Sequence, residues 1–254
     1  MRRFLKFLGL FAFLLILLPC AVGAGIGYAK GWPSSWRTAN WGSSHVLPAA
    51  ADVPEATVMV LSSRTGQWKS IFAEHMSLVL KPHGAAQWTR YDVVGWGNPV
   101  RKDAYVADAF WYGNAPRIVT RISGAEAARL IPKIEASIAR YPNAARGSYT
   151  VWPGPNSNTF VSWVVRNTDG FAVELPPVAV GKDWLGWGGA APAPSKTGYS
   201  FSIAGVFGGT LALREGLELH LLGSTIGIDP GDLAIKLPAL GRLSLFDLMP
   251  KAIS

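Results

Sequence analysis

The chain has 254 residues, of which 49% are hydrophobic and only 16% are charged, and its formal net charge is +8. This apolar content argues for a folded core and against disorder. Lys and Arg are scattered and form no run, which argues against the basic patch typical of nucleic-acid-binding proteins. A dispersed positive charge either suits anionic lipid headgroups or serves solubility alone, so we expect membrane lipid, and no nucleic acid, as a partner.

The first 30 residues predict a membrane anchor. Arg2, Arg3 and Lys6 precede residues 7–29, which contain no charged residue and are long enough to cross a bilayer. Because basic residues stay on the cytoplasmic side, we expect a single-pass protein of the bacterial inner membrane with its main domain on the periplasmic side. The small residues that follow Pro19 also allow the alternative of a cleaved signal peptide.

Cys20 is the only cysteine, which excludes an intramolecular disulfide and a cysteine-based zinc site. No two of the four histidines have the spacing of metal ligands. We therefore expect neither a metal nor a cofactor.

Residues 31–55 predict a tether, and the tryptophans in it suit the membrane interface. From residue 56 to residue 248 we expect one α+β domain, in which an antiparallel sheet packs on helices. Strands are expected at 57–61, 76–80 and 88–94 because these stretches are rich in β-branched and aromatic residues and are separated by turn residues.

Two helices are expected in the middle of the domain. Ser123 and Glu126 have the spacing of a capping box at the start of a helix over 123–141, within which Pro132 should produce a kink or a break. The second helix, 157–166, follows a Pro-Gly-Pro corner at 153–155, and its start offers backbone N–H groups that lack partners.

A β-rich extension is expected from about residue 199. It contains a predicted hairpin around Gly208 and Gly209, then a half-buried strand at 217–221 with Glu218 and His220 on its polar face. The leucine-rich tail, 233–248, either covers the sheet or rests on the membrane surface.

Four blocks of sequence resemble a bacterial membrane-anchored family known as domain of unknown function 3750. They are Arg-Thr-Gly-Gln-Trp-Lys at 64–69, Thr-Arg-Tyr-Asp-Val-Val-Gly-Trp-Gly at 89–97, Trp-Pro-Gly-Pro-Asn-Ser-Asn-Thr-Phe at 152–160 and Gly-Lys-Asp at 181–183. The resemblance covers most of residues 56–245 and implies no established activity.

More distantly, the chain resembles circularly permuted papain-like proteins, the lecithin:retinol acyltransferase group and its relatives. In that group a catalytic His on a strand precedes a nucleophilic Cys at a helix start, in a motif like Asn-Cys-x-x-Phe. Here His75 begins a strand, and Ser157 stands at the Cys position of Asn156-Ser157-Asn158-Thr159-Phe160. The resemblance implies a permuted papain-like core with Ser157 as nucleophile and His75 as its base.

Asp92 is the acidic candidate to orient His75, since a hairpin over 76–94 places it opposite that histidine. Each residue also has a structural interpretation. Ser157 could cap the helix, His75 could be a hydrogen-bonded strand residue, and Asp92 could pair with Arg90 or Lys81.

Candidates for ligand binding are Asn156, Asn158 and Trp96, the last with neighbouring aromatic residues that could line a groove or simply build the core. Serine does not ionise as cysteine does at a helix start, so a serine nucleophile needs a well-aligned base. Our first hypothesis is therefore binding of an envelope lipid or a peptidoglycan peptide. The alternatives are an envelope hydrolase or acyltransferase acting on an amide or ester bond, and a purely structural membrane protein.

Overall fold

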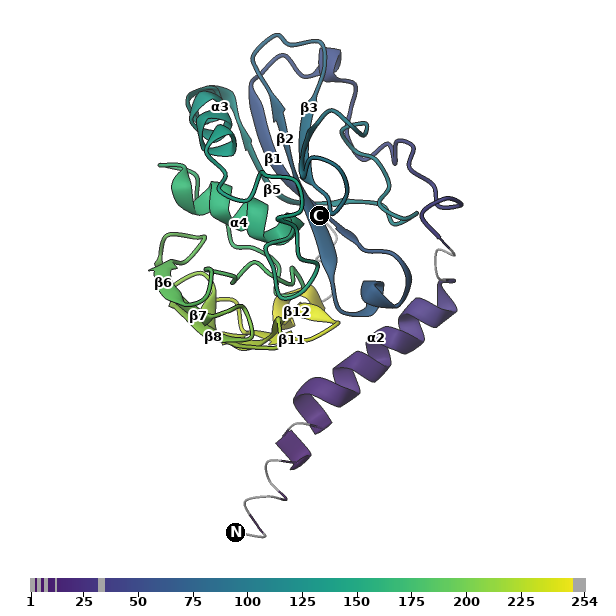
Figure 1. Cartoon of the computed structure of the whole chain (residues 1–254), viewed down its shortest axis with the longest axis vertical. Coiled ribbons are helices and arrows are strands. Elements are labelled where there is room, and N and C mark those ends of the chain that lie inside the picture. The colour runs from purple at the N-terminus through teal and green to yellow at the C-terminus, as the bar shows by residue number, and fades with distance from the viewer. Residues whose placement is uncertain (1–2, 4–5, 7–8, 12, 32–34, 249–254) are drawn as a thin grey trace.

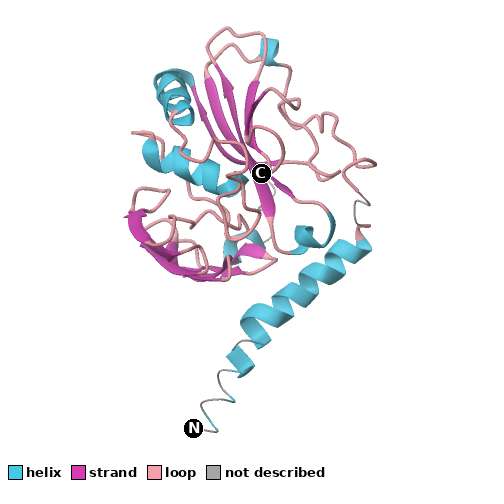
Figure 2. Cartoon of the chain, in the orientation of Figure 1, coloured by secondary structure: helices cyan, strands magenta, loops and turns pink. Residues whose placement is uncertain are grey.

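The computed structural model describes residues 13–31 and 35–248, together with residues 3, 6 and 9–11. Arg2 and residues 7–8, which belong to the predicted anchor, lie outside the described residues. Figures 1 and 2 show a body of two antiparallel sheets with helices beside them, and an N-terminal helix that leaves the body at one side. The expected α+β class with an N-terminal apolar helix is thus confirmed.

The N-terminal helix comprises a π-helical segment, η1 (Phe13–Leu17), and α2 (Leu18–Ala29). Among the described residues, Gly9–Ala29 is one helix of 21 residues, long and apolar enough to cross a membrane. The C-terminal half of this helix touches the body, because a Cβ built on Gly23 would lie only 2.8 Å from the Cβ of Ala239. Glycine at this position allows the helix to approach the body closely.

The first sheet has the strand order β4-β3-β2-β1-β5, and all its neighbours are antiparallel. Its strands are β1 (Thr57–Arg64), β2 (Glu74–Lys81), β3 (Thr89–Val93), β4 (Val100–Lys102) and β5 (Arg117–Ser123). Short helices η2 (Ala50–Asp52) and η3 (Gln67–Ile71) precede and follow β1. The strands β1 and β2 are buried almost throughout, as expected for central strands covered on both faces.

The two faces of β2 differ in what covers them, because successive side chains of a strand point to opposite sides. Met76, Leu78 and Leu80 pack in one core with residues of α3 (Gly124–Ala139) and α4 (Ser157–Asn167). Val79 belongs to a smaller core on the other face, against which Leu47 and Ala107 pack. The helices therefore cover one face of the first sheet, and irregular segments cover the other.

The start of the helix α3 differs from its prediction, and Pro132 does not interrupt the helix. No side chain caps the start at Ser123. The hydroxyl of Ser123 instead accepts a 3.3 Å hydrogen bond from Arg121 Nε. Burial of Ile131 and Ile134, on either side of the proline, offsets the hydrogen bond lost there.

The segment predicted as a tether packs on the body from about residue 41 onward. Trp41 makes an edge contact with Trp111, with ring centroids 5.2 Å apart, and also stacks near Tyr105. Ser43 forms a β-bridge with Ala109. Trp41 is thus part of an aromatic cluster of the body.

The second sheet is a meander in which each strand pairs with the next, from β6 to β12. Its elements are β6 (Gly189–Pro192), β7 (Gly198–Ile203), β8 (Phe207–Ala212), β9 (Gly216–Leu221), β10 (Ser224–Asp229), β11 (Ala234–Leu237) and β12 (Gly241–Ser244), followed by α5 (Leu245–Leu248). The β-rich region thus starts about ten residues earlier than expected.

The predicted turn at Gly208 and Gly209 is wrong, since both glycines lie inside β8. The turn falls between Ile203 and Phe207, which pair across the hairpin. A Cβ on Gly208 would lie 2.4 Å from the carbonyl oxygen of Phe201. These glycines therefore serve close strand packing and not the turn.

An ion-pair network holds the second sheet to the body. Glu218 on β9 binds Lys236 at 2.7 Å and Lys182 at 2.9 Å, and all three side chains are buried. Burial alone would raise the pKa of Glu218, but the two lysines outweigh it and lower the pKa to about 2. Glu218 therefore stays ionised inside the protein.

We predict that this carboxylate makes stability depend on acid. Because the folded-state pKa of about 2 is below the ordinary 4.5, its contribution of about 3 kcal/mol is fully present above pH 4.5 and lost as the pH falls toward 2. Glu218→Gln should lower the melting temperature at neutral pH, since it leaves the buried Lys182 without a carboxylate and Lys236 with Glu174 alone. It should also flatten the decline below pH 4.5. Thermal unfolding of the full chain in detergent micelles measures both effects.

Glu126→Gln, at an exposed position of α3, is the control and should change neither the melting temperature nor its pH dependence. If the melting temperature falls with acid as steeply in Glu218→Gln as in the original chain, Glu218 is not the source of the acid dependence.

Candidate functional site

His75 lies near the start of β2 and is only 4% exposed. Its Nε2 lies 2.8 Å from Asp92 Oδ1, and its ring stacks on Trp111 with centroids 3.6 Å apart and planes 6° from parallel. The expected pairing of His75 with Asp92 is therefore present. His75 is four residues from Val79 in β2, so its side chain projects from the same face of the sheet, which is the face opposite α3 and α4.

Arg90 completes this cluster from β3. Its Nε donates to Asp92 Oδ2 at 2.7 Å and one terminal nitrogen donates to Oδ1 at 2.9 Å, a bidentate pair. The other terminal nitrogen donates to the carbonyl oxygens of Val106 and Ala107, at 3.3 and 3.2 Å. The guanidinium thus joins the sheet to the irregular segment that carries Trp111.

The electrostatics of the cluster favour a neutral imidazole next to a carboxylate. Burial lowers the pKa of His75, and the hydrogen bond to Asp92 opposes this only in part. Burial would raise the pKa of Asp92, but Arg90 and the hydrogen-bonded His75 together outweigh the effect of burial, and the pKa is lowered. Since an ionised Asp92 can only accept, Nε2 carries the proton and Nδ1 is left as an unprotonated acceptor.

The start of α4 is capped by Asn156 and not by Ser157. The side-chain oxygen of Asn156 accepts from the backbone N–H groups of Asn158 and Thr159, at 2.9 and 3.1 Å. The hydroxyl of Thr159 accepts in return from the backbone N–H of Asn156 at 3.1 Å, which completes a capping box. Ser157 is the first residue of the helix proper.

Asn158 fastens this helix start to β2 on both sides of His75. Its side-chain oxygen accepts from Met76 N at 3.0 Å, and its amide nitrogen donates to the carbonyl oxygens of Glu74 and Val180, both at 2.8 Å. The strand β3 pairs with β2 only along Leu78–Leu80. The amide of Asn158 therefore binds the edge of β2 that β3 leaves unpaired.

The remaining candidates are not joined to the cluster by hydrogen bonds. In the part of the chain that the structure describes, no hydrogen bond connects the buried Ser157 hydroxyl to His75. Trp96 is exposed in the loop between β3 and β4, where its carbonyl oxygen accepts from Arg101 at 2.7 Å. The side-chain amides of Asn156 and Asn158 are used within the protein. The structure thus brings His75 and Asp92 together and leaves Trp96 apart.

The sequence indicated Arg90 only as a possible partner of Asp92, and Trp111 only as one of several aromatic residues that could line a groove or build the core. The signal for Arg90 was its spacing of two from Asp92 in a strand, which puts both side chains on one face. Trp111 lies in an irregular segment, and no spacing in the sequence connects it with His75. Among the described residues, no group of three His, Cys, Asp or Glu side chains could hold a metal ion.

The body also has a groove outside the His75 cluster. This groove of about 540 Å³ runs between the first and second sheets and is lined by Arg64, Glu74, Arg117 and Arg242. Its arginines are paired, since Glu74 binds both Arg64 and Arg117, at 3.5 and 2.7 Å, and Arg242 binds Asp229 at 3.1 Å. The groove is therefore nearly neutral in charge.

We predict that the cap, and not the serine beside it, stabilises α4. Asn156→Ala should cost about 2 kcal/mol, because it removes the cap and leaves buried backbone groups without partners. Ser157→Ala removes no side-chain hydrogen bond to any residue that the structure describes, and it should lower the melting temperature far less. Thermal unfolding of the full chain compares the two variants, and a larger loss for Ser157→Ala would contradict the assignment.

Comparison with known proteins gives one match. Residues 55–184 match a protein family described as protein of unknown function (DUF3750). No curated protein and no solved structure matches the chain. Because the family match covers just over half of the 254 residues, the chain belongs to the DUF3750 family.

Proposed function

We propose that this protein is a single-pass protein of the bacterial inner membrane whose body, on the outer side, binds an envelope ligand or partner without hydrolysing it. An envelope lipid or a peptidoglycan peptide is the ligand class that the location suggests. The observation that carries the proposal is that the His75 imidazole is buried and inaccessible to a substrate. The imidazole lies between Asp92 and Trp111, is 4% exposed, and makes no hydrogen bond to Ser157 among the described residues.

A distant relationship to permuted papain-like proteins is part of the proposal. It rests on the order of a strand-borne His75 and a later helix start in which Ser157 takes the place of Cys. In a papain-like enzyme the thiolate forms readily beside an imidazole, whereas a serine needs a base in hydrogen-bond contact. A descendant that has lost the Cys would keep the His75–Asp92 pair for its contribution to the fold.

An envelope hydrolase or acyltransferase is the second candidate function. It is favoured by one observation, the state of His75. With Asp92 accepting from Nε2 and the pKa of the imidazole lowered, Nδ1 is unprotonated, as a general base requires. Such an enzyme would need a rearrangement that brings Ser157 Oγ within about 3 Å of Nδ1.

The reaction with a serine-directed acylating probe separates the two candidates. For a binding protein we expect no labelling of the full chain, of Ser157→Ala or of His75→Gln. Labelling of the original chain that is lost in both variants would establish Ser157 as a nucleophile and overturn the proposal. Ser162, which is buried in the same helix, provides the control Ser162→Ala, which should not affect any labelling.

The anchor is tested by the mass of the mature protein. Because basic residues precede the apolar helix and the helix packs against Ala239, we expect residues 1–29 to remain on the protein in the membrane fraction. Intact-mass measurement of that fraction decides the question. A mature protein that begins between residues 24 and 30 would mean that the segment is a cleaved signal peptide.

A further inference from the structure

The second sheet has the reverse of the usual distribution of polar and apolar side chains. Ser202, Glu218 and Lys236 point toward the body and are buried, whereas Leu211 and Leu217 point away from it and are exposed. In a water-soluble protein, alternation normally puts the apolar side chains inside. Apolar side chains on the outside, with polar ones inside, are the pattern of strands whose outer face meets lipid.

The exposed side chains form a continuous row across all seven strands. Directly paired residues from β6 to β12 are Pro192, Tyr199, Leu211, Leu217, Ile228, Ile235 and Leu243. From Tyr199 to Leu243 they are between 40% and 71% exposed. With strands about 4.8 Å apart, the row extends roughly 29 Å.

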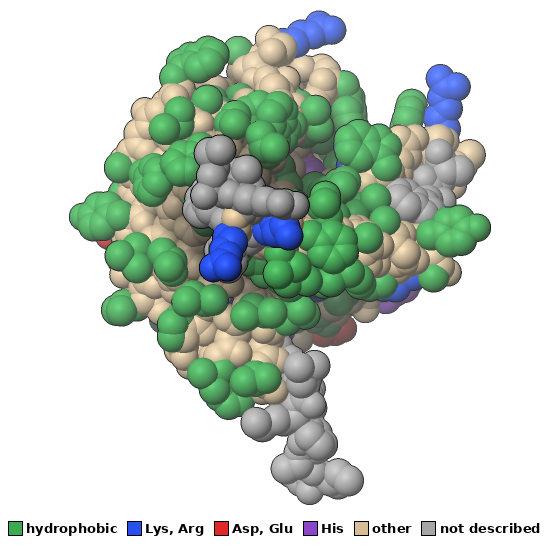
Figure 3. Space-filling model, turned by 90° about the horizontal axis from the view of Figure 1, so that it is seen from below, with side chains coloured by type: hydrophobic (Ala, Val, Ile, Leu, Met, Phe, Trp, Pro, Cys, Tyr) green, Lys and Arg blue, Asp and Glu red, His purple; other side chains and the backbone are tan. Residues whose placement is uncertain are grey.

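The rest of the outer face is equally free of charge. Outward positions on either side of the row are Phe201, Ile203, Phe207, Gly209, Leu219, Leu221, Ser224, Ile226 and Leu237. None of them is ionisable. Figure 3, which looks at the molecule from below, shows hydrophobic side chains spread across this side, basic side chains near the middle of the view, and acidic ones only at its margin.

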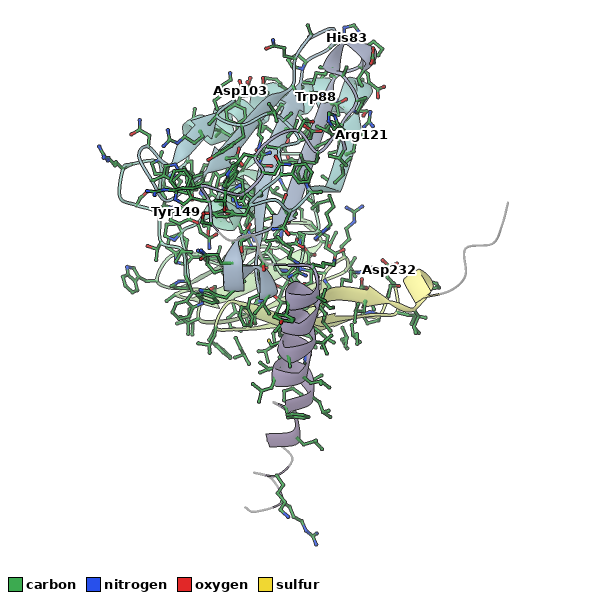
Figure 4. The ribbon with its side chains drawn as sticks, turned by 90° about the vertical axis from the view of Figure 1, so that its right-hand side faces the viewer. His83, Trp88, Asp103, Arg121, Tyr149 and Asp232 are labelled. Carbon is green, nitrogen blue, oxygen red and sulfur yellow. The ribbon has the colours of Figure 1, made fainter. Side chains whose placement is uncertain are left out.

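The helix α2 leaves the body on the same side as this face. In Figure 4 the strands of the second sheet run across the direction of α2, and the N-terminal part of the helix continues beyond them. The contact of Gly23 with Ala239, in the turn between β11 and β12, fixes where the sheet lies along the helix. A membrane that α2 crosses therefore meets the outer face of the sheet.

The position of this contact along the helix also sets how deep the second sheet would lie in the bilayer. The 21 residues of Gly9–Ala29 extend about 31 Å at 1.5 Å per residue, which matches a hydrocarbon core of about 30 Å. Gly23 lies six residues before the outer end of that span, or about 9 Å inside it. Apolar faces of interfacial elements are typically buried about 5–10 Å into the boundary between headgroups and acyl chains.

We propose that the outer face of the second sheet is a lipid-binding surface, seated in the outer leaflet of the bilayer that α2 crosses. The proposal rests on the anchored topology of the proposed function and not on the His75 cluster. Tyr199 provides the one hydroxyl of the row, so the row offers almost nothing for hydrogen-bonded recognition of a protein, whereas acyl chains need no such partner. The net charge of +8 favours attraction to a membrane that contains anionic lipid.

The test places a fluorescent label on this face of the full chain in nanodiscs that contain phosphatidylglycerol. Cys20→Ala removes the only cysteine, and Leu211→Cys then provides one labelling site on the apolar row. We expect lipids that carry a quencher near the headgroup to quench this label, and aqueous iodide to quench it several-fold less than a label in water. Ile228→Cys, on the same row, repeats the measurement should Leu211→Cys impair folding.

His83→Cys is the matched control. His83 is exposed in the turn between β2 and β3, at the end of the body away from α2 (Figure 4). Its label should be open to iodide and unaffected by the lipid quencher. Labels at both row positions that are as open to iodide as the one at His83 would overturn the proposal.

Two other outcomes are distinguishable. If the labels on the row are shielded from iodide but are not quenched by lipid, the lipid-binding proposal is overturned. The row would then contact protein, such as a second copy of the chain. A mature protein without residues 1–29 whose row is still quenched by lipid would disprove the anchor while supporting the lipid-binding surface.

Discussion

The position of Glu218 between two buried lysines is the interaction on which the second sheet depends. Moving a charged group out of water costs several kcal/mol unless the charge is paired. Here the carboxylate of Glu218 forms ion pairs with both Lys236 of the sheet and Lys182 of the body. Without Glu218, Lys182 would have no carboxylate partner, and Lys236 would keep only Glu174. The polar inner face of the sheet can therefore be buried only because the body supplies charges of its own.

The segment that carries Lys182 also joins the other parts of the body. Val178 O accepts from Glu74 N in β2 at 3.0 Å, and Gly181 O accepts from the hydroxyl of Thr159 in α4 at 2.8 Å. Three successive contacts thus bind β2, α4 and the second sheet to residues 178–182. The family match ends at residue 184, so the ion pair of Lys182 with Glu218 links the part of the chain that is matched with the part that follows.

Much of the first sheet and of the cluster could be predicted from the sequence, because the signals are local. The hairpin of β2 and β3 puts Asp92 on the same face as His75, and only the positions of turn residues were needed to expect this. The cap was expected at the start of α4, where three polar residues compete. Only the structure shows that Asn156 accepts both backbone hydrogen bonds.

The second sheet shows what sequence alone does not provide. Alternation in β9 was recognised, but alternation separates two faces without saying which one is inside. Glu218 and His220 were expected on a polar, outward face, whereas both are buried. Their hydrogen-bond partners, such as Thr210 and Thr225 for His220, come from other strands. These partners are known only once the register of the strand pairs is known.

The contact between Gly23 and Ala239, together with the packing of Trp41 on Trp111, has a consequence for how the body meets its partners. The body packs directly against the C-terminal half of the N-terminal helix, and the chain returns to the body about ten residues after α2 ends. If α2 crosses a membrane, as proposed above, the body would move with the lipids and its encounters would be confined to two dimensions. It would then reach molecules presented at the bilayer surface, and a molecule held farther out would itself have to extend to the membrane.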